Sequence, residues 1–150
     1  KGKEKADRKK IWIYINSGGG DVLSGFSAID IFDISETEIN GVVFAYAASM
    51  AGYLIMACHN RYCFPNSVIL MHDGEIGVSN SASKTKDTMK FFDKLDDRTK
   101  QFVVKHTKKT PEFYDEIYDK EYYIYGNEKG KELGIIDYVI GEDVALSEIL

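Results

Sequence analysis

Cysteine, proline and long apolar runs are scarce in this chain, and the shortages exclude whole classes of protein. Its 150 residues include two cysteines, Cys58 and Cys63, which are too few for a disulfide framework or a zinc site. No apolar stretch approaches the ~18 residues that a membrane-spanning helix requires. We therefore expect a cytoplasmic protein with reduced cysteines, no membrane association and no bound metal. The chain begins at Lys1 rather than at Met, so we expect an N-terminal part to be missing.

Clustered positive charge is scarce too. The formal net charge is −5, whereas recognition of nucleic-acid phosphates needs gathered Lys and Arg, so we expect no nucleic-acid partner. The one basic cluster lies in residues 1–10, which we interpret as a charged, solvated lead-in; a membrane or RNA-binding arm is the alternative. The remaining residues, 11–150, have the size and apolar content of a single domain.

Short apolar runs alternate with helical patterns along this domain. Strands are predicted over residues 11–15, 41–46, 67–72 and 135–140, and helices over 21–33, 50–57, 84–108 and 111–118. The polar, glycine-containing segment 73–81 is predicted to be a loop or a weak hairpin. Apolar strands that alternate with helices are typical of an α/β fold with a mostly parallel, buried sheet.

Three chemically capable features follow predicted strands, and open α/β sheets place their sites at the carboxyl ends of strands. A glycine triplet, Gly18 to Gly20, allows backbone N–H groups to approach a developing negative charge. Ser49 lies among small residues where a strand meets a helix, and a helix N-terminus favours an oxyanion. His72 ends an apolar strand next to a polar loop.

Each feature alone has a plainer interpretation. A glycine triplet is usually a turn, and no Lys follows it as in a phosphate-binding loop. A serine at a helix start is more often an N-cap than a nucleophile, and a single histidine is more often a hydrogen-bonded polar group than a base. The combination favours catalysis, because acyl transfer needs a nucleophile, a base and an oxyanion hole together. Tyr53, Leu54 and Met56, which follow Ser49, are interpreted as core rather than pocket residues.

The motifs that contain these features resemble those of Clp protease proteolytic subunits. Residues 14–20 (YINSGGG) resemble the family's YINSPGG, and residues 47–51 (AASMA) resemble the AASMG motif around its nucleophile. Residues 65–72 (PNSVILMH) resemble the family's LPNS…MIH segment, and residues 133–140 (LGIIDYVI) resemble its YGLID-x-VI ending. The motifs occur in family order.

The resemblance implies a crotonase-like α/β fold built of repeated ββα units, with a mostly parallel sheet and a long protruding handle helix over about residues 84–108. By motif position, Ser49 is the nucleophile and His72 is its base. The oxyanion hole is implied to consist of the backbone amides of Gly19 and Met50. The residues implied to hold an extended substrate are Gly20, Ile76, Gly77 and Val78.

The third member of the implied Ser–His–acid triad is open between two residues. Aligned on the aromatic pair that follows it, Glu121 takes the family's aspartate position, and Asp119 is the alternative acid. Glutamate also serves in hydrolase triads. Gly18 stands where the family has Pro, and Asp73 stands where it has Gln. These departures indicate a divergent member, and a phage or mobile-element relative fits such a pattern.

The function implied by the resemblance is that of a serine endopeptidase subunit that hydrolyses unfolded polypeptides inside a compartment. The family forms heptameric rings that stack into tetradecamers and are fed by an AAA+ ATPase unfoldase. No cofactor is therefore implied for this chain, since ATP is used only by the partner. A catalytically silent ring subunit is the alternative. An acyl-CoA enzyme of the related fold is disfavoured by the AASM and MH motifs, and a membrane peptidase by the lack of a Ser–Lys dyad and an anchoring helix.

Overall fold

The computed structural model describes residues 8–149, which form an α/β fold built on one sheet. Its strands are β1 (Ile11–Ser17), β2 (Ile39–Ala48), β3 (Asn60–Cys63), β4 (Val68–Met71), β5 (Tyr122–Tyr125) and β6 (Tyr138–Val139). Its helices are α1 (Val22–Ile34), α2 (Met50–Ala57), α3 (Ala82–His106), α4 (Pro111–Ile117) and α5 (Lys131–Leu133), with a π-helical turn η2 (Gly126–Gly130) and a 3-10 turn η3 (Leu146–Glu148). The predicted lead-in over residues 1–10 lies outside the described residues, apart from residues 8–10.

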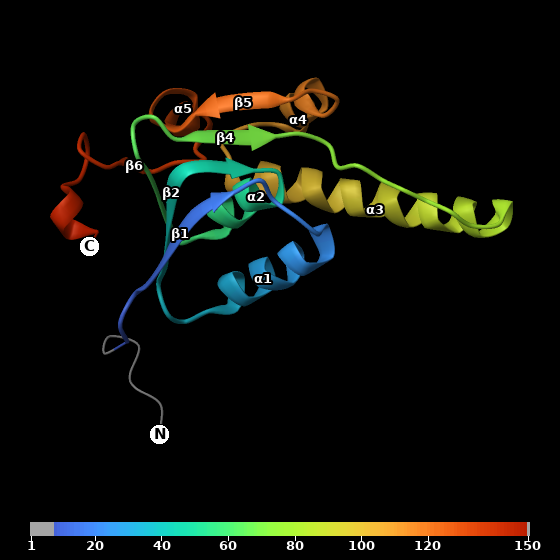
Figure 1. The fold of residues 1–150 in the computed structure, drawn as a ribbon, viewed down its shortest axis with the longest axis horizontal. Helices are drawn as coiled ribbons and strands as arrows, with labels where there is room; N and C mark the ends of the chain where they lie inside the picture. Colours follow the sequence, from blue (N-terminus) through green and yellow to red (C-terminus); the bar gives the residue numbers. More distant parts are fainter. Residues whose placement is uncertain (1–7, 150) are drawn as a thin grey trace.

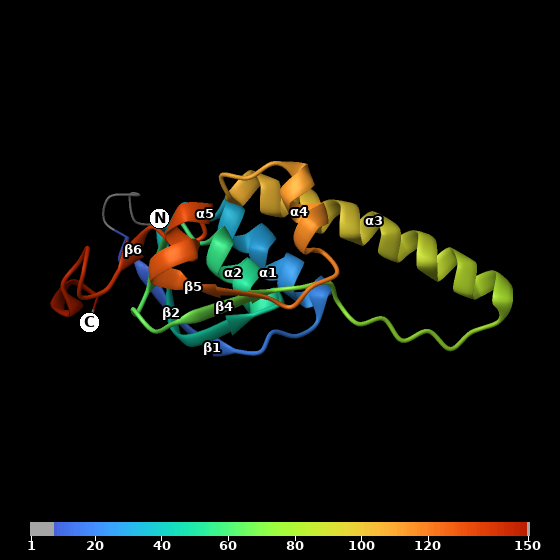
Figure 2. The same cartoon turned by 90° about the horizontal axis from the view of Figure 1, so that it is seen from above.

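Parallel pairing dominates the sheet. The strand order is β5-β4-β2-β3-β6, and β1 also pairs with β2. All of these pairs are parallel except β4 with β5. Figure 2 shows α1, α2 and α4 on one face of the sheet, while α3 runs far beyond the body of the domain. The predicted α/β class, the mostly parallel sheet and the long protruding helix are therefore confirmed. No helix in the described part of the chain combines the length and apolarity needed to cross a membrane.

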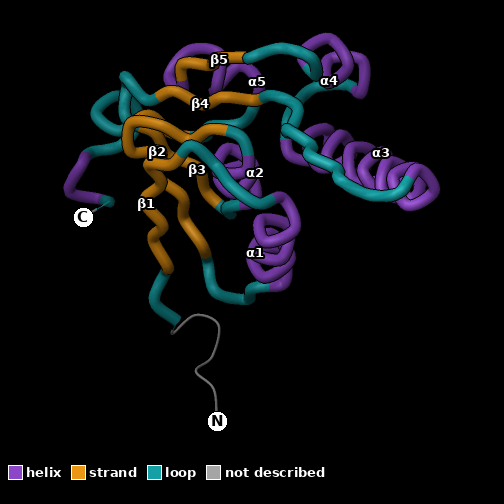
Figure 3. The backbone as a smooth tube through the Cα atoms, turned by 45° about the vertical axis from the view of Figure 1, so that its right-hand side comes forward, coloured by secondary structure: helices purple, strands orange, loops and turns teal. Residues whose placement is uncertain are grey.

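Strand β2 pairs with three neighbours because it bends in the middle (Figure 3). Residues 40–43 pair with β3, and residues 46–48 pair with β4. Between them Ala45 has a φ of +79°, in the left-handed region that disfavours any residue with a side chain. The pairing of β1 with β2 also shifts here, from Ile15 opposite Val43 to Ser17 opposite Ala47. The bend thus carries the end of β2 from β3 towards β4.

The core lies between the sheet and its helices. Val43 and Ile69 from the strands and Ile55 from α2 are completely buried. Glycine allows α1 to pack closely against α2, because a Cβ atom on Gly25 would lie only 2.1 Å from Sδ of Met50. This contact fixes Met50, the first residue of α2.

Three strands differ from the prediction made from the sequence. The sequence predicts neither β3 (NRYC), which carries polar residues and gains its conformation from parallel pairing with β2 and β6, nor β5, which pairs with β4. The predicted strand 135–140 shrinks to β6, because the amides of Ile135 and Ile136 both donate to the carbonyl of Gly130 in a turn. The other predicted helices and strands are present and differ only at their ends.

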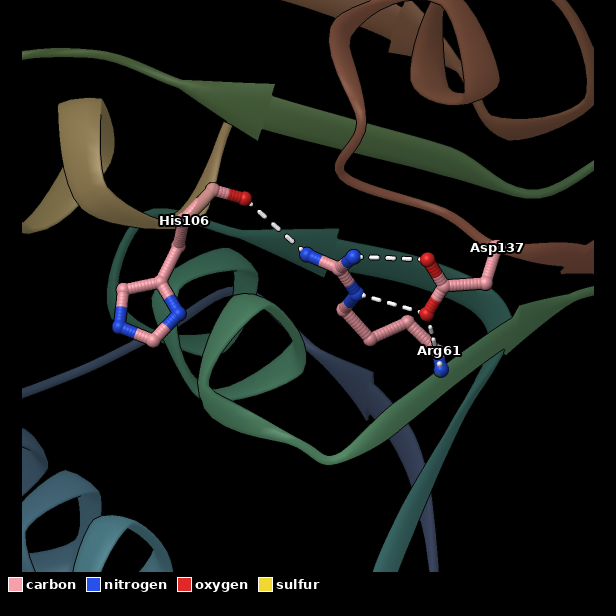
Figure 4. Close-up of polar contacts among 3 residues, drawn as sticks. All are labelled: Arg61, His106 and Asp137. Carbon is pink, nitrogen blue, oxygen red and sulfur yellow. Dashed lines mark hydrogen bonds and ion pairs between the residues drawn. The ribbon is translucent and has the colours of Figure 1, made fainter. Parts of the chain in front are cut away.

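An arginine clamp joins three parts of the chain that lie far apart in the sequence (Figure 4). Arg61 in β3 donates from Nε and Nη2 to the two carboxylate oxygens of Asp137, at 2.9 and 2.7 Å, and from Nη1 to the carbonyl oxygen of His106, at 3.0 Å. Bidentate, charge-assisted contacts are among the stronger hydrogen-bonding arrangements in proteins. Because His106 ends α3 and Asp137 precedes β6, the clamp holds the base of α3 against the sheet.

His106 itself is kept neutral by its surroundings. Its ring stacks on Phe102 with the ring centroids 4.2 Å apart, and its Nε2 atom is buried without a hydrogen-bond partner among residues 8–149. Burial, aided by the charge of Lys105, lowers the pKa of His106 below its ordinary value of 6.5. The unfolded chain therefore binds a proton on this side chain at a higher pH than the folded chain does.

We expect the free energy of unfolding to decrease as the pH falls below the ordinary histidine pKa of 6.5, and the decrease to level off below the folded pKa of His106. Urea denaturation at about pH 7.5 and about pH 5.5 measures this loss. His106→Gln is expected to reduce the difference in the free energy of unfolding between the two pH values, since the parent protein and the variant have every other titrating group in common. The same difference in the parent protein and the variant would contradict this assignment.

Ala45→Gly is expected to raise the free energy of unfolding by about 1 kcal/mol, because glycine adopts a positive φ without a clash of its Cβ atom. Ala45 is exposed, so little packing is lost. The same substitution at Ala28, inside α1, is the control and is expected to lower the free energy of unfolding by about 1 kcal/mol. Chemical denaturation measures both variants, and a loss of stability at both positions would refute the strain at Ala45.

Candidate active site

The carboxyl ends of β1, β2 and β4 lie at one edge of the sheet, beside the base of α3 (Figure 1). The Gly18 to Gly20 turn follows β1, Ser49 follows β2, and His72 follows β4. Since parallel strands place their carboxyl ends on the same side, these three features share one edge although they are distant in the sequence.

Ser49 lies in a strained turn between β2 and α2. Its backbone angles are φ +54° and ψ −128°, which are unfavourable for a residue with a side chain. The amide of Ser49 donates to the carbonyl of Leu70 in β4 at 2.9 Å, which holds the turn against the sheet. Its side chain makes no capping hydrogen bond with α2, so the interpretation as a simple N-cap does not apply. Strain of this kind at a strand-to-helix turn is typical of a nucleophile that must be presented outward.

Gly19 packs directly on this turn. It has a φ of +101°, and a Cβ atom there would lie 2.7 Å from the carbonyl oxygen of Ala48, 2.8 Å from Cβ of Ser49 and 3.1 Å from the amide nitrogen of Met50. The backbone of the glycine turn and the first amide of α2 therefore lie side by side next to Ser49. The Gly19 amide donates to Oγ of Ser17 at 3.2 Å, while the amide of Met50, at the first position of α2, has no intrahelical acceptor.

His72 is paired with Glu121. Nδ1 of His72 lies 2.9 Å from Oε1 of Glu121, with side-chain exposures of 23% and 59%. The pair follows from strand register, because Met71 at the end of β4 stands opposite Tyr122 at the start of β5, so the two flanking residues meet. A proton on Nδ1, donated to Glu121, leaves Nε2 as the acceptor nitrogen of the neutral ring. Among the described residues, Glu121 rather than Asp119 is the carboxylate in contact with this histidine.

A cavity of about 860 Å³ lies next to Ser49 and His72. Its walls come from the glycine turn, α2, residues 73–77, α3 and α4. Of the four residues predicted to hold substrate, Gly20, Ile76 and Gly77 line the cavity, whereas Val78 follows them without lining it. Tyr53, interpreted as core from the sequence, is both buried and part of the cavity wall; Leu54 and Met56 do not line it. The sequence does not separate these roles, because all three residues lie in one apolar helix.

Burial makes the two cysteines poor nucleophiles. Both thiols are free and buried, and burial raises the pKa of Cys58 and that of Cys63 to about 12. A thiol with such a pKa is protonated at neutral pH, whereas the thiolate is the reactive form. Within residues 8–149, no group of three or more His, Cys, Asp or Glu side chains is placed to hold a metal ion.

Fold and site together describe an α/β protein in which Ser49 and His72 follow neighbouring parallel strands and line one cavity, and Glu121, which precedes the antiparallel strand β5, contacts His72. The family model for Clp protease matches residues 3–143, which include the whole sheet and the long helix α3. The chain belongs to the Clp protease family and is a Clp-type peptidase subunit. The resemblance that the sequence motifs carry is thus confirmed.

Gly19→Ala is expected to slow the reaction of Ser49 with a fluorophosphonate probe by on the order of 10²-fold, because it would displace the amide that we expect to bind the oxyanion. The added methyl group would press on Ala48 and Ser49 at a φ that only glycine adopts easily. Gly18→Ala is the matched control, because nothing lies within 4 Å of its added methyl group. Equal labelling rates for both variants, with melting temperatures unchanged, would exclude the glycine turn from the site.

Proposed function

We propose that this chain is a serine endopeptidase subunit in which Ser49 is the nucleophile, His72 is the general base and Glu121 is the acid of the triad. The observation that carries the proposal is the His72–Glu121 pair, in which Nδ1 of His72 lies 2.9 Å from Oε1 of Glu121. The strand before His72 pairs with the strand before Ser49, whose backbone is strained and whose side chain makes no capping hydrogen bond. A structural serine has no need of such backbone angles, and they persist only where the surrounding structure enforces them.

In the proposed reaction, Oγ of Ser49 attacks the peptide carbonyl while Nε2 of His72 takes its proton. The tetrahedral intermediate collapses as His72 returns that proton to the leaving amine, and the acyl group stays on Ser49. Water then repeats the sequence, with His72 as base, and releases the carboxylic acid and free Ser49. Glu121 keeps the proton on Nδ1 and stabilises the imidazolium that forms between these steps.

The oxyanion is proposed to bind the amides of Gly19 and Met50. The Met50 amide stands at the N-terminus of α2, where the helix dipole favours negative charge. The Gly19 amide must release Oγ of Ser17 before it can donate to the oxyanion, so substrate binding includes a small change in this turn. A contact of 3.2 Å between exposed groups is weak enough for an oxyanion to replace it.

The substrate is proposed to be an extended polypeptide that lies along residues 73–78, which have no regular secondary structure of their own. Such a segment offers free backbone groups for pairing with an added strand. Self-assembly into a heptameric ring, and of two rings into a tetradecamer, is proposed through α3, whose outer part projects away from the domain and exposes 43% of Met89 and 46% of Phe91. An AAA+ unfoldase is the proposed partner, with ATP used only there.

Fluorophosphonate labelling of the assembled protein tests this proposal. We expect Ser49→Ala and His72→Ala to abolish labelling. Glu121→Gln is expected to slow it by up to on the order of 10⁴-fold, because an amide neither fixes the tautomer nor balances the charge of the imidazolium. Asp119→Asn is the matched control and is expected to label like the parent.

Absence of labelling in a folded, assembled parent protein would overturn the proposal. That outcome would favour a catalytically silent ring subunit. Loss of labelling in Asp119→Asn but not in Glu121→Gln would reassign the acid.

A further inference from the structure

The cavity beside Ser49 is acidic. The charged residues that line its approximately 860 Å³ are Asp21, Asp73, Glu75, Asp93, Asp96 and Asp97. Within the part of the chain that the structure describes, none of these carboxylates belongs to an ion pair, and neither Lys nor Arg lines the cavity. A concave site lined by one sign of charge attracts the opposite sign.

Three of the four acidic residues of helix α3 line this cavity, although the helix carries more basic residues than acidic ones. Asp93, Asp96 and Asp97 line the cavity, whereas the neighbouring Lys94 does not, and Lys100 pairs with Asp115 at 2.6 Å. The contribution of α3 to the negative charge of the cavity therefore reflects a separation of charge around the helix rather than an acidic composition.

Tyr53 supplies a buried polar group in the cavity wall. It lies four residues after Ser49 on α2, one helical turn away, and only 6% of it is exposed. Its ring packs edge-on against Phe102, with the centroids 5.9 Å apart. Its hydroxyl group makes no hydrogen bond within residues 8–149 and is not among the side-chain atoms sealed from solvent, so it is open to the cavity. Burial and the nearby charge of Asp96 raise the pKa of Tyr53, so the hydroxyl stays protonated. A hydroxyl without a protein partner at the wall of the cavity is available to bind a polar group of a ligand.

Asp96 lies close to this hydroxyl and is fixed by neighbours. The hydroxyl of Tyr114 donates to Oδ1 of Asp96 at 2.9 Å. Partial burial raises the pKa of Asp96, and this effect outweighs the opposing influence of hydrogen bonds from Tyr114 and Tyr118 and of the charge of Lys100. A cation placed beside it would restore that lost stabilisation.

The remaining wall is apolar. Leu23, Ile76 and Met89 line the cavity while each leaves between 43% and 52% of its surface exposed. A long cationic side chain matches this combination, because its methylene stem packs on apolar surface while its charged head contacts carboxylates.

We propose that this cavity binds a Lys or Arg side chain of the substrate, on the acyl side of the scissile bond, with its head group between the Tyr53 hydroxyl and the Asp96 carboxylate. This inference rests on the proposed function, since it names the substrate preference of the same site. The amide of Tyr53 donates to the carbonyl of Ser49 at 3.3 Å, and both residues line the cavity, so a side chain that enters the cavity beside Ser49 can reach Tyr53.

The test uses matched fluorogenic peptides that differ only at the residue before the scissile bond, which is Lys, norleucine or Glu. With the assembled protein, kcat/KM is expected to be about tenfold to a hundredfold higher for Lys than for norleucine, as for a charge-assisted hydrogen bond. Asp96→Asn and Tyr53→Phe are each expected to reduce this ratio several-fold. Asp93→Asn, which removes charge without breaking a hydrogen bond to tyrosine, is expected to reduce it too. Asp87→Asn is the control, because Asp87 lies on α3 outside the cavity and pairs with Lys90.

Binding separates this inference from the proposed function. The Ser49→Ala variant cannot cleave, so its affinity for the Lys and norleucine peptides, measured by fluorescence anisotropy, reports on the cavity alone. Tighter binding of the Lys peptide supports the inference even if no peptide is hydrolysed by the parent protein. Equal binding, or a parent enzyme that cleaves the norleucine peptide as fast as the Lys peptide, would overturn it while leaving the peptidase assignment intact.

Discussion

Strand β2 bends at Ala45, and both the sheet and the site depend on this bend because residues 40–43 pair with β3 while residues 46–48 pair with β4. In a straight strand the end of β2 would continue along β3 and would not meet β4. The hydrogen bond from the Ser49 amide to the Leu70 carbonyl, at 2.9 Å, exists only because the strand changes neighbour. That bond and the contact with Gly19 sustain the unfavourable angles of Ser49, as a well-packed surrounding must do for any strained residue.

The single antiparallel pair in the sheet has a separate consequence. After β4 the chain leaves the sheet, runs out and back through α3 and α4, and returns as β5 in the opposite direction. This excursion delivers Glu121 to His72 across a sequence separation of 49 residues. It also builds most of the cavity wall, since residues 73–77, α3 and α4 all belong to it. The carboxylate that contacts His72 and most of the cavity wall are therefore products of one excursion.

Much of this arrangement could be predicted from residue patterns. The apolar runs and amphipathic stretches identify most strands and helices, because burial of one face imposes a regular spacing. Ser49 and His72 stand out because they follow apolar strands and occur in recognisable motifs. β3 and β5 could not be predicted, since four residues carry little pattern and their conformation depends on pairing with distant strands. The same limit applies to Tyr53, whose apolar neighbours conceal a hydroxyl that lines a cavity.

By itself, the sequence determined the α/β class, the order of the main elements, the Clp protease family and the two residues at the centre of the proposed chemistry. These properties can be predicted locally, since each follows from the spacing of apolar residues or from a motif within a short stretch of neighbouring residues. The tertiary structure decided which carboxylate meets His72, how β2 bends and which charges of α3 face the cavity. The sequence favoured Glu121 over Asp119 only by alignment on the aromatic pair that follows it. The register of β5 against β4 decides between them, because pairing between strands fixes which flanking residues come into contact.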